Sequence, residues 1–203
     1  MTSGTDAAGD CLSIPTPAGL VIAPGAGADR DNAALVSIEA GLPEIPVERL
    51  TLATTSVPRA VEKISVAMAE FANRLGVSSK EIALGGRSFG GRSCSVGVAE
   101  GAFGAAGLVL LSYPLHPPGK KEKLRVDHFG AIDVPTLFVS GLRDPFGSPA
   151  EFNEHVRSVS GPVRFDWIKG NHSPRGQETE ILDSIRSFFS LRCNRTDREH
   201  PTD

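Results

Sequence analysis

The chain has 203 residues, of which 40% are hydrophobic and 22% charged, and its formal net charge is −3. This length and composition predict one globular domain that buries a single core. The weak negative charge, with no basic stripe, argues against nucleic acid as a partner. No apolar run approaches the roughly 18 residues that a membrane-spanning helix needs, so we expect no membrane partner.

The two ends of the chain differ in character from the middle. The first ten residues, MTSGTDAAGD, lack the basic and apolar segments of a signal peptide. Together with three scattered cysteines, this predicts a cytoplasmic protein with reduced thiols. Residues 1–10 and 192–203 are small or polar and predict flexible tails, which leaves 11–191 as the domain.

Short apolar runs recur along the chain and predict strands. The first of them ends in a glycine-rich turn, and all six lie at 19–27, 47–52, 81–86, 107–114, 135–141 and 163–170. The run at 107–114 is apolar at consecutive positions, which is typical of parallel strands covered on both faces.

Longer segments with helical signals separate these runs. Apolar residues at three- and four-residue steps predict a helix over 59–75. A capping box with proline at the first helical position predicts another over 148–159. Residues 89–100 and the apolar pattern of 181–189 predict two more. This alternation predicts an α/β fold, a mostly parallel sheet of about six or seven strands flanked by helices on both faces.

The stretch GGRSFGG, Gly85 to Gly91, follows one predicted strand and precedes a helix. It contains Gly86-x-Ser88-x-Gly90, the pattern of a nucleophile elbow, in which a strained turn exposes a serine. Glycines on both sides of the serine remove Cβ atoms that we expect to clash with it. Taken alone, the pattern is equally consistent with a glycine-rich turn that carries a surface serine.

Two further polar residues follow predicted strands. Asp144 comes after the strand at 135–141, and His172 comes after the strand at 163–170. A nucleophilic serine needs a base to take its proton and a carboxylate to orient that base. The order Ser88, Asp144, His172, at the carboxyl ends of separate strands, predicts a catalytic triad, although each residue alone suits an ordinary loop.

The loop APGAGAD at 23–29 follows the first strand and predicts part of an oxyanion hole. We expect one donor to be the backbone N–H of Phe89 and the other that of Ala26, with Gly27 as its nearest competitor. The loop lacks the lysine of a phosphate-binding loop and the third glycine of a dinucleotide fingerprint. The sequence therefore predicts no cofactor, and it predicts no metal.

These motifs give the chain a resemblance to the α/β-hydrolase superfamily over about residues 20 to 190. More narrowly, it resembles the small lidless branch related to dienelactone hydrolases, which includes a subunit of a eukaryotic histone-acetyltransferase complex. The stretches that carry the resemblance are APGAGAD, LGGRSFGGR, LLSYPLHPPGK, LFVSGLRDPFG and GNHS. The resemblance implies Ser88 as nucleophile, Asp144 as acid and His172 as base, with no lid domain.

The chain departs from that branch in three ways. Pro24 stands where the branch usually has histidine before the oxyanion glycine, and the nucleophile is serine where dienelactone hydrolases use cysteine. The N-terminal strands of the full fold are also shortened, because only LSIPTPAG precedes Val21. The substrate of dienelactone hydrolases is therefore not carried over.

Four residues near the predicted site are candidate substrate contacts: Gly27, Arg87, His116 and Phe146. Arg87 suits an anionic substrate group or a salt bridge on the far side of the elbow. His116 suits substrate contact or, because prolines surround it, the ordering of its loop. Cys94 lies inside the helix after Ser88 and is expected in the core.

The leading hypothesis is a serine hydrolase that cleaves a small carboxylic ester or thioester through an acyl-serine intermediate. The alternative is a binding or scaffold protein that kept the elbow with weak or no turnover. The expected partner is a small-molecule acyl substrate, and the expected assembly is a monomer or homodimer.

Overall fold

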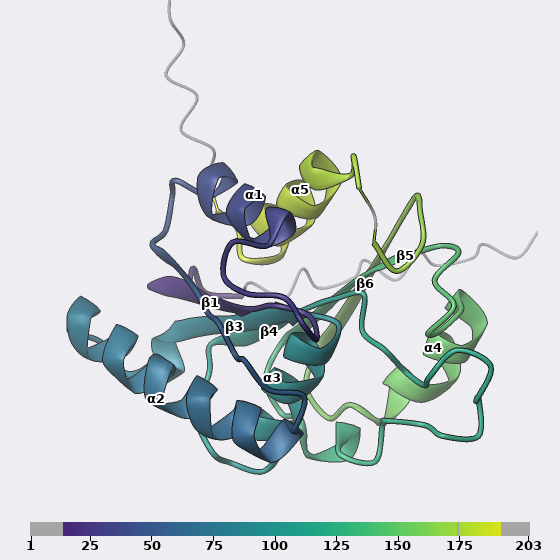
Figure 1. Ribbon diagram of the computed structural model, residues 1–203. Helices are drawn as coiled ribbons and strands as arrows, with labels where there is room; N and C mark the ends of the chain where they lie inside the picture. The colour runs from purple at the N-terminus through teal and green to yellow at the C-terminus, as the bar shows by residue number, and fades with distance from the viewer. Residues whose placement is uncertain (1–13, 174, 192–203) are drawn as a thin grey trace, which may run out of the picture.

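A computed structural model describes residues 14–173 and 175–191 of the chain (Figure 1). Its centre is a sheet of six parallel strands in the order β2-β1-β3-β4-β5-β6. The strands are β1 (Gly19–Ala23), β2 (Val47–Arg49), β3 (Ile82–Arg87), β4 (Gly107–Leu111), β5 (Thr136–Gly141) and β6 (Val163–Ile168). The predicted fold class is confirmed, with the lower of the two expected strand numbers.

Five α-helices cover the sheet in two layers. They are α1 (Ala33–Gly41), α2 (Val57–Leu75), α3 (Phe89–Ala99), α4 (Pro149–His155) and α5 (Glu178–Phe188). In Figure 1, α1 and α5 lie on one face of the sheet, and α2, α3 and α4 lie on the other. Short 3₁₀ turns occur at Ser79–Glu81, Phe129–Ala131 and Val156–Ser158. The described residues include no lid domain, and none of their helices has the length and apolar character that crossing a bilayer requires.

The helix layers enclose two apolar cores, and successive residues of a strand alternate between them. In β4, Leu108 and Leu110 join the core beside α2, α3 and α4, whereas Val109 and Leu111 join the core beside α1 and α5. Both faces of the strand are therefore buried, which explains why its sequence is apolar at every position after Gly107.

Local signals in the sequence place the ends of two helices well. Gly76 ends α2 in the left-handed conformation, with φ 69°. At the start of α4, the Ser148 hydroxyl accepts from the Glu151 amide while the Glu151 carboxylate accepts from the Ser148 amide. The predicted helix at 148–159 is shorter as an α-helix, because its last turn is the 3₁₀ turn Val156–Ser158.

Two predicted strands are shorter in the structure, and one helix was not predicted. The strand expected at 47–52 pairs only over β2, and the strand expected at 107–114 ends at Leu111 because Ser112 turns the chain with φ 48°. The helix α1 was not predicted from the sequence. It is one of the shorter helices and buries only Leu35 and Ile38, so it shows little helical periodicity.

The strand order reverses between β1 and β3. The chain passes from β1 outward to β2, returns to β3 on the other side of β1, and then proceeds toward β6. In open parallel sheets, ligands bind beyond the carboxyl ends of the strands at such a reversal. A ligand site is therefore expected at the loops that follow β1 and β3.

Candidate active site

Ser88 occupies the sharp turn between β3 and α3. Its backbone angles, φ 51° and ψ −114°, are rare for a non-glycine residue and persist only when the surroundings impose them. A Cβ on Gly86 would lie 2.6 Å from the backbone of Gly90, and one on Gly90 would lie 2.6 Å from the carbonyl oxygen of Ala23. The glycines therefore let the turn close on itself and on β1. This corrects the expectation that they relieve a clash with the serine.

Asp144 follows β5 in a loop that lies against the loop after β6. A Cβ on Gly141 would lie 2.5 Å from the carbonyl oxygen of Asn171, so the two loops approach as closely as their backbones permit. The Arg143 amide donates to the Gly170 carbonyl across this contact, at 2.9 Å. The sequence places Asp144 and His172 on different loops, and this close approach brings them together.

His172 lies between Asp144 and Ser88 and contacts both. Its Nδ1 is 3.0 Å from Asp144 Oδ1 and 2.8 Å from Oδ2, and its Nε2 is 2.8 Å from Ser88 Oγ. An Nδ1–H that donates to the carboxylate leaves Nε2 free to accept the hydroxyl proton of Ser88. The Asp144 side chain is 1% exposed and that of His172 is 18% exposed, so solvent reaches the imidazole but not the carboxylate.

The loop after β1 lies beside this triad. Gly25 to Ala28 form a turn in which the Ala28 amide donates to the Gly25 carbonyl at 3.2 Å, and Gly27 has φ 73°. A Cβ on Gly25 would lie 3.8 Å from the Cβ of Ser88. Within residues 14–173 and 175–191, no backbone carbonyl accepts from the amide of Ala26 or of Phe89. The backbone bonds of the described residues therefore leave both predicted oxyanion donors without a carbonyl acceptor.

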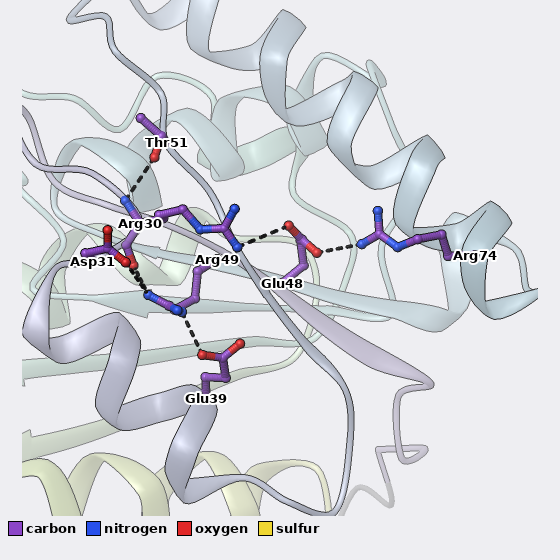
Figure 2. A network of polar contacts seen from close by, with 7 residues as sticks. All are labelled: Arg30, Asp31, Glu39, Glu48, Arg49, Thr51 and Arg74. Carbon is purple, nitrogen blue, oxygen red and sulfur yellow. Dashed lines mark hydrogen bonds and ion pairs between the residues drawn. The ribbon is translucent and has the colours of Figure 1, made fainter.

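A network of charged residues holds the outer part of this loop (Figure 2). Arg49 of β2 donates to the Arg30 carbonyl, and also to Asp31 Oδ1 at 3.2 Å and Glu39 Oε2 at 2.8 Å. The Arg30 amide donates to Thr51 Oγ1 at 3.0 Å. The edge strand β2 and helix α1 thus fix the far end of the loop that carries Ala26.

A family model described as Alpha/beta hydrolase domain matches residues 16–184 of the chain. The chain belongs to this family. The match covers every strand of the sheet and all three residues of the Asp144–His172–Ser88 contact.

Solved structures of other alpha/beta hydrolases share the fold. A dienelactone hydrolase from Anabaena variabilis is 17% identical, with a TM-score of 0.69 over 88% of this chain and 90% of that one. Est1E from Butyrivibrio proteoclasticus is 16% identical, with a TM-score of 0.66 over 87% and 88% of the two chains. A carboxylesterase of Bacillus cereus is 14% identical, with a TM-score of 0.64 over 87% and 89%. At these identities the likeness establishes the fold alone.

The Arg87 side chain turns toward the loop that carries His172. Its Nη2 donates to the His172 carbonyl at 2.8 Å and to Ser173 Oγ at 2.6 Å. In the described parts of the chain no carboxylate lies within 4.0 Å of its guanidinium, which corrects the salt-bridge alternative. Burial lowers the pKa of Arg87, and the nearby charge of Asp144 partly offsets this. Sequence reasoning missed Ser173, and no pattern marked it.

His116 is 2% exposed and so is not available to a substrate in this structure. Its Nδ1 lies 2.9 Å from the Pro117 carbonyl oxygen, and its Nε2 lies 3.4 Å from Glu151 Oε1. The structure therefore favours the loop-ordering role over substrate contact. Phe146 and Gly27 lie at the rim of the triad, with Phe146 half-buried and Gly27 exposed.

Two cavities lie near the loops that surround the triad, although Ser88, Asp144 and His172 line neither of them. One of about 310 Å³ lies between α1, α5 and the ends of β3 and β4, and Arg87, Ser112 and Ser173 contribute to its wall. The other, of about 470 Å³, lies between the Gly25–Asp29 loop and residues 51–55. Each is of the size that holds a small ligand.

Cys94 is fully buried in α3, where its Sγ lies 3.2 Å from the Gly85 carbonyl oxygen. Burial raises the pKa of the Cys94 thiol, which keeps it protonated. Its predicted place in the core is confirmed, and it is not a candidate nucleophile.

Proposed function

We propose that this protein is a serine hydrolase that cleaves a small carboxylic ester or thioester through an acyl-serine intermediate. One observation carries the proposal, the unbroken contact from Asp144 through His172 to Ser88, in which both the Nδ1–Oδ2 and the Nε2–Oγ distances are 2.8 Å. A base within hydrogen-bond reach of a nucleophile, and itself oriented by a third group, is the arrangement that activates a hydroxyl. Membership of the alpha/beta hydrolase family supports it.

In the first half-reaction, Ser88 Oγ attacks the carbonyl carbon while its proton passes to His172 Nε2. Asp144 holds the imidazole in the required tautomer and stabilises the imidazolium that forms. The carbonyl oxygen becomes an oxyanion, which accepts hydrogen bonds from the amides of Phe89 and Ala26. As the tetrahedral intermediate collapses, Nε2 gives its proton to the leaving alcohol or thiol, and the acyl group remains on Ser88.

In the second half-reaction, a water molecule takes the place of the leaving group. His172 Nε2 accepts a proton from this water as its oxygen attacks the acyl carbon. The same two amides hold the second oxyanion. Collapse returns the proton to Ser88 Oγ and releases the carboxylic acid.

The openness of the site favours small substrates. The described residues carry no lid, and the cavities beside the triad are about 310 and 470 Å³. Long acyl chains need a larger apolar enclosure than these shallow spaces provide. Arg87 lines the first cavity and Gly27 lines the second, and both residues are proposed to contact the substrate.

The narrower placement, in the lidless branch related to dienelactone hydrolases, remains part of this proposal. Structural neighbours whose names include dienelactone hydrolase and carboxylesterase support it at the level of fold. The proposed assembly of monomer or homodimer likewise remains a prediction.

The first test is covalent labelling with a tagged fluorophosphonate, which reports an activated serine without knowledge of the substrate. We expect the probe to attach to Ser88, as located by peptide mass spectrometry. Ser88→Ala abolishes the adduct, and His172→Ala slows its formation by about 10³-fold or more, because the base is lost. Cys94→Ala serves as the control and should label like the wild type.

Two outcomes would decide against the proposal. Wild-type protein that is folded by circular dichroism and takes up no probe would favour the scaffold alternative. Labelling that persists in Ser88→Ala would place the nucleophile elsewhere.

A further inference from the structure

The loop that carries the acid is a tight turn whose sequence, Asp144-Pro145-Phe146-Gly147, has the residue preferences of a type I turn. The Gly147 amide donates to the Asp144 carbonyl at 3.3 Å, which closes the turn. The Phe146 amide donates to Asp144 Oδ1 at 2.9 Å. The same residue whose amide binds the carboxylate therefore has its ring in a fixed position beside the triad.

That ring lies on the imidazole of His172. The two ring centroids are 4.0 Å apart and the ring planes differ by 27°, which is a stacked arrangement. The Phe146 carbonyl accepts from the His116 amide at 3.2 Å, so the loop after β4 supports the turn from behind. Arg87 holds the other side of the base loop through the His172 carbonyl. The stack is thus supported on both sides by hydrogen-bonded backbone.

We infer that Phe146 is a positioning residue that stabilises the imidazolium form of His172 during acylation. This inference rests on the proposed serine-hydrolase function and deepens it. The face of an aromatic ring carries partial negative charge and attracts a cation that lies over it. When the proton of Ser88 Oγ moves to Nε2, the imidazole becomes that cation, with Asp144 at its edge and Phe146 on its face.

The timing of this charge decides which rate constant it affects. Before the proton moves, the imidazole is neutral and the attraction to the ring is weaker. The interaction is therefore stronger in the transition state than in the complex that precedes it, and such interactions accelerate the chemical step without tightening binding. A residue that instead contacts the substrate, as the sequence suggested for Phe146, affects binding first.

The test uses a saturable fluorophosphonate and measures two constants for each variant, the limiting rate of inactivation and the probe concentration at half saturation. Phe146→Leu keeps an apolar cover on His172 but removes the aromatic face. We expect it to lower the limiting rate about 5- to 30-fold and to change the half-saturating concentration less than about twofold. Phe146→Tyr restores the ring and should restore the rate.

A graded series separates charge from shape. Phe146 is replaced by phenylalanine that carries one, two or three ring fluorines. Each fluorine withdraws electron density from the aromatic face with little change in the size of the ring. The logarithm of the limiting rate should fall steadily along this series. Phe103→Leu is the matched control, because Phe103 packs against Gly97 of α3, and its rate should equal that of the wild type.

Each other result overturns the inference in a distinguishable way. A wild type that takes up no probe removes the proposed function and this inference together. A reactive wild type with an equally reactive Phe146→Leu, or with a flat fluorine series, removes this inference alone. A change confined to the half-saturating concentration makes Phe146 a substrate contact.

Discussion

At the scale of single residues, the nucleophile elbow depends on glycines, which have a hydrogen atom where other residues carry a Cβ. Gly90, in the first turn of α3, lies so close to the end of β1 that a Cβ would meet backbone, which has no rotamer to change. The strained φ of Ser88 persists only because these contacts impose it. The backbone geometry of Ser88 therefore depends directly on how tightly this turn packs against β1.

Gly90→Ala tests this coupling. The added Cβ would lie 2.6 Å from the Ala23 carbonyl oxygen, so the turn must move or β1 must yield. We expect the free energy of unfolding to fall by about 3 kcal/mol and probe labelling at Ser88 to be lost. Gly130→Ala is the control, because its Cβ would lie 3.7 Å from the nearest atom outside its chain neighbours, and it should change stability by less than about 0.5 kcal/mol. Urea unfolding measures both, and an unchanged Gly90→Ala would contradict the argument.

At the scale of elements, the short edge strand β2 supports the loop after β1, which is the proposed oxyanion loop. It pairs with β1 over only three residues, yet its Arg49 joins that loop to α1 (Figure 2). The Arg49 side chain is 15% exposed, whereas that of Arg74, which bonds Glu48 on the same strand, is 54% exposed. Water therefore screens the guanidinium of Arg74 more than that of Arg49, although the Asp31 and Glu39 carboxylates are themselves exposed.

Arg49→Met on β2 and Arg74→Met on α2 form a matched pair, because each removes an arginine that binds acidic residues on or beside this strand. Arg49→Met removes the donor to the Arg30 carbonyl and to two carboxylates that are 41% and 78% exposed, so we expect a loss of about 1 kcal/mol in the free energy of unfolding. Its probe-labelling rate should also fall, because the loop with Ala26 loses its outer support. Arg74→Met should change stability by less than about 0.5 kcal/mol and leave labelling unchanged. Equal effects of the two substitutions would show that the network does not anchor the loop.

At the scale of the whole molecule, acid stability depends on how the layers pack. His128 lies beside α3, with its Nε2 2.8 Å from Ser95 Oγ. Burial and then the charge of Arg92 lower the pKa of His128 to about 4, below its ordinary value. In the unfolded chain His128 takes up a proton near pH 6.5, whereas in the folded protein it does so only near pH 4. Stability is therefore full above pH 6.5 and is lost as the pH falls through this window.

Urea unfolding of the wild type and His128→Asn at pH 7 and pH 5 tests this contribution. We expect the wild type to lose about 1 kcal/mol more than the variant between the two pH values, after allowance for solvent screening of the partly exposed ring. The pKa of Glu151 is lowered to about 2 by Lys121 and Ser148, so Glu151 stays ionised at pH 5 and does not interfere. An identical pH dependence of the two proteins would refute the assignment.

The sequence alone determined the features whose signals are local. Strand runs with both faces apolar, the helix end at Gly76 and the capping box at Ser148 depend on residues within one or two turns. The order of Ser88, Asp144 and His172 after three separate strands was also readable, because parallel strands bring their carboxyl ends to one edge. These signals predicted the fold class and the candidate triad.

Only the tertiary structure decided how these parts meet. The distances within the triad depend on the close approach of Gly141 to the base loop, and the stack of Phe146 on His172 depends on a turn in one loop facing another. The contacts of Arg87 were equally invisible, because their partners His172 and Ser173 lie far away in sequence. Local patterns specify an element by its own energetics, whereas contacts between distant loops exist only once the sheet has placed those loops at one edge.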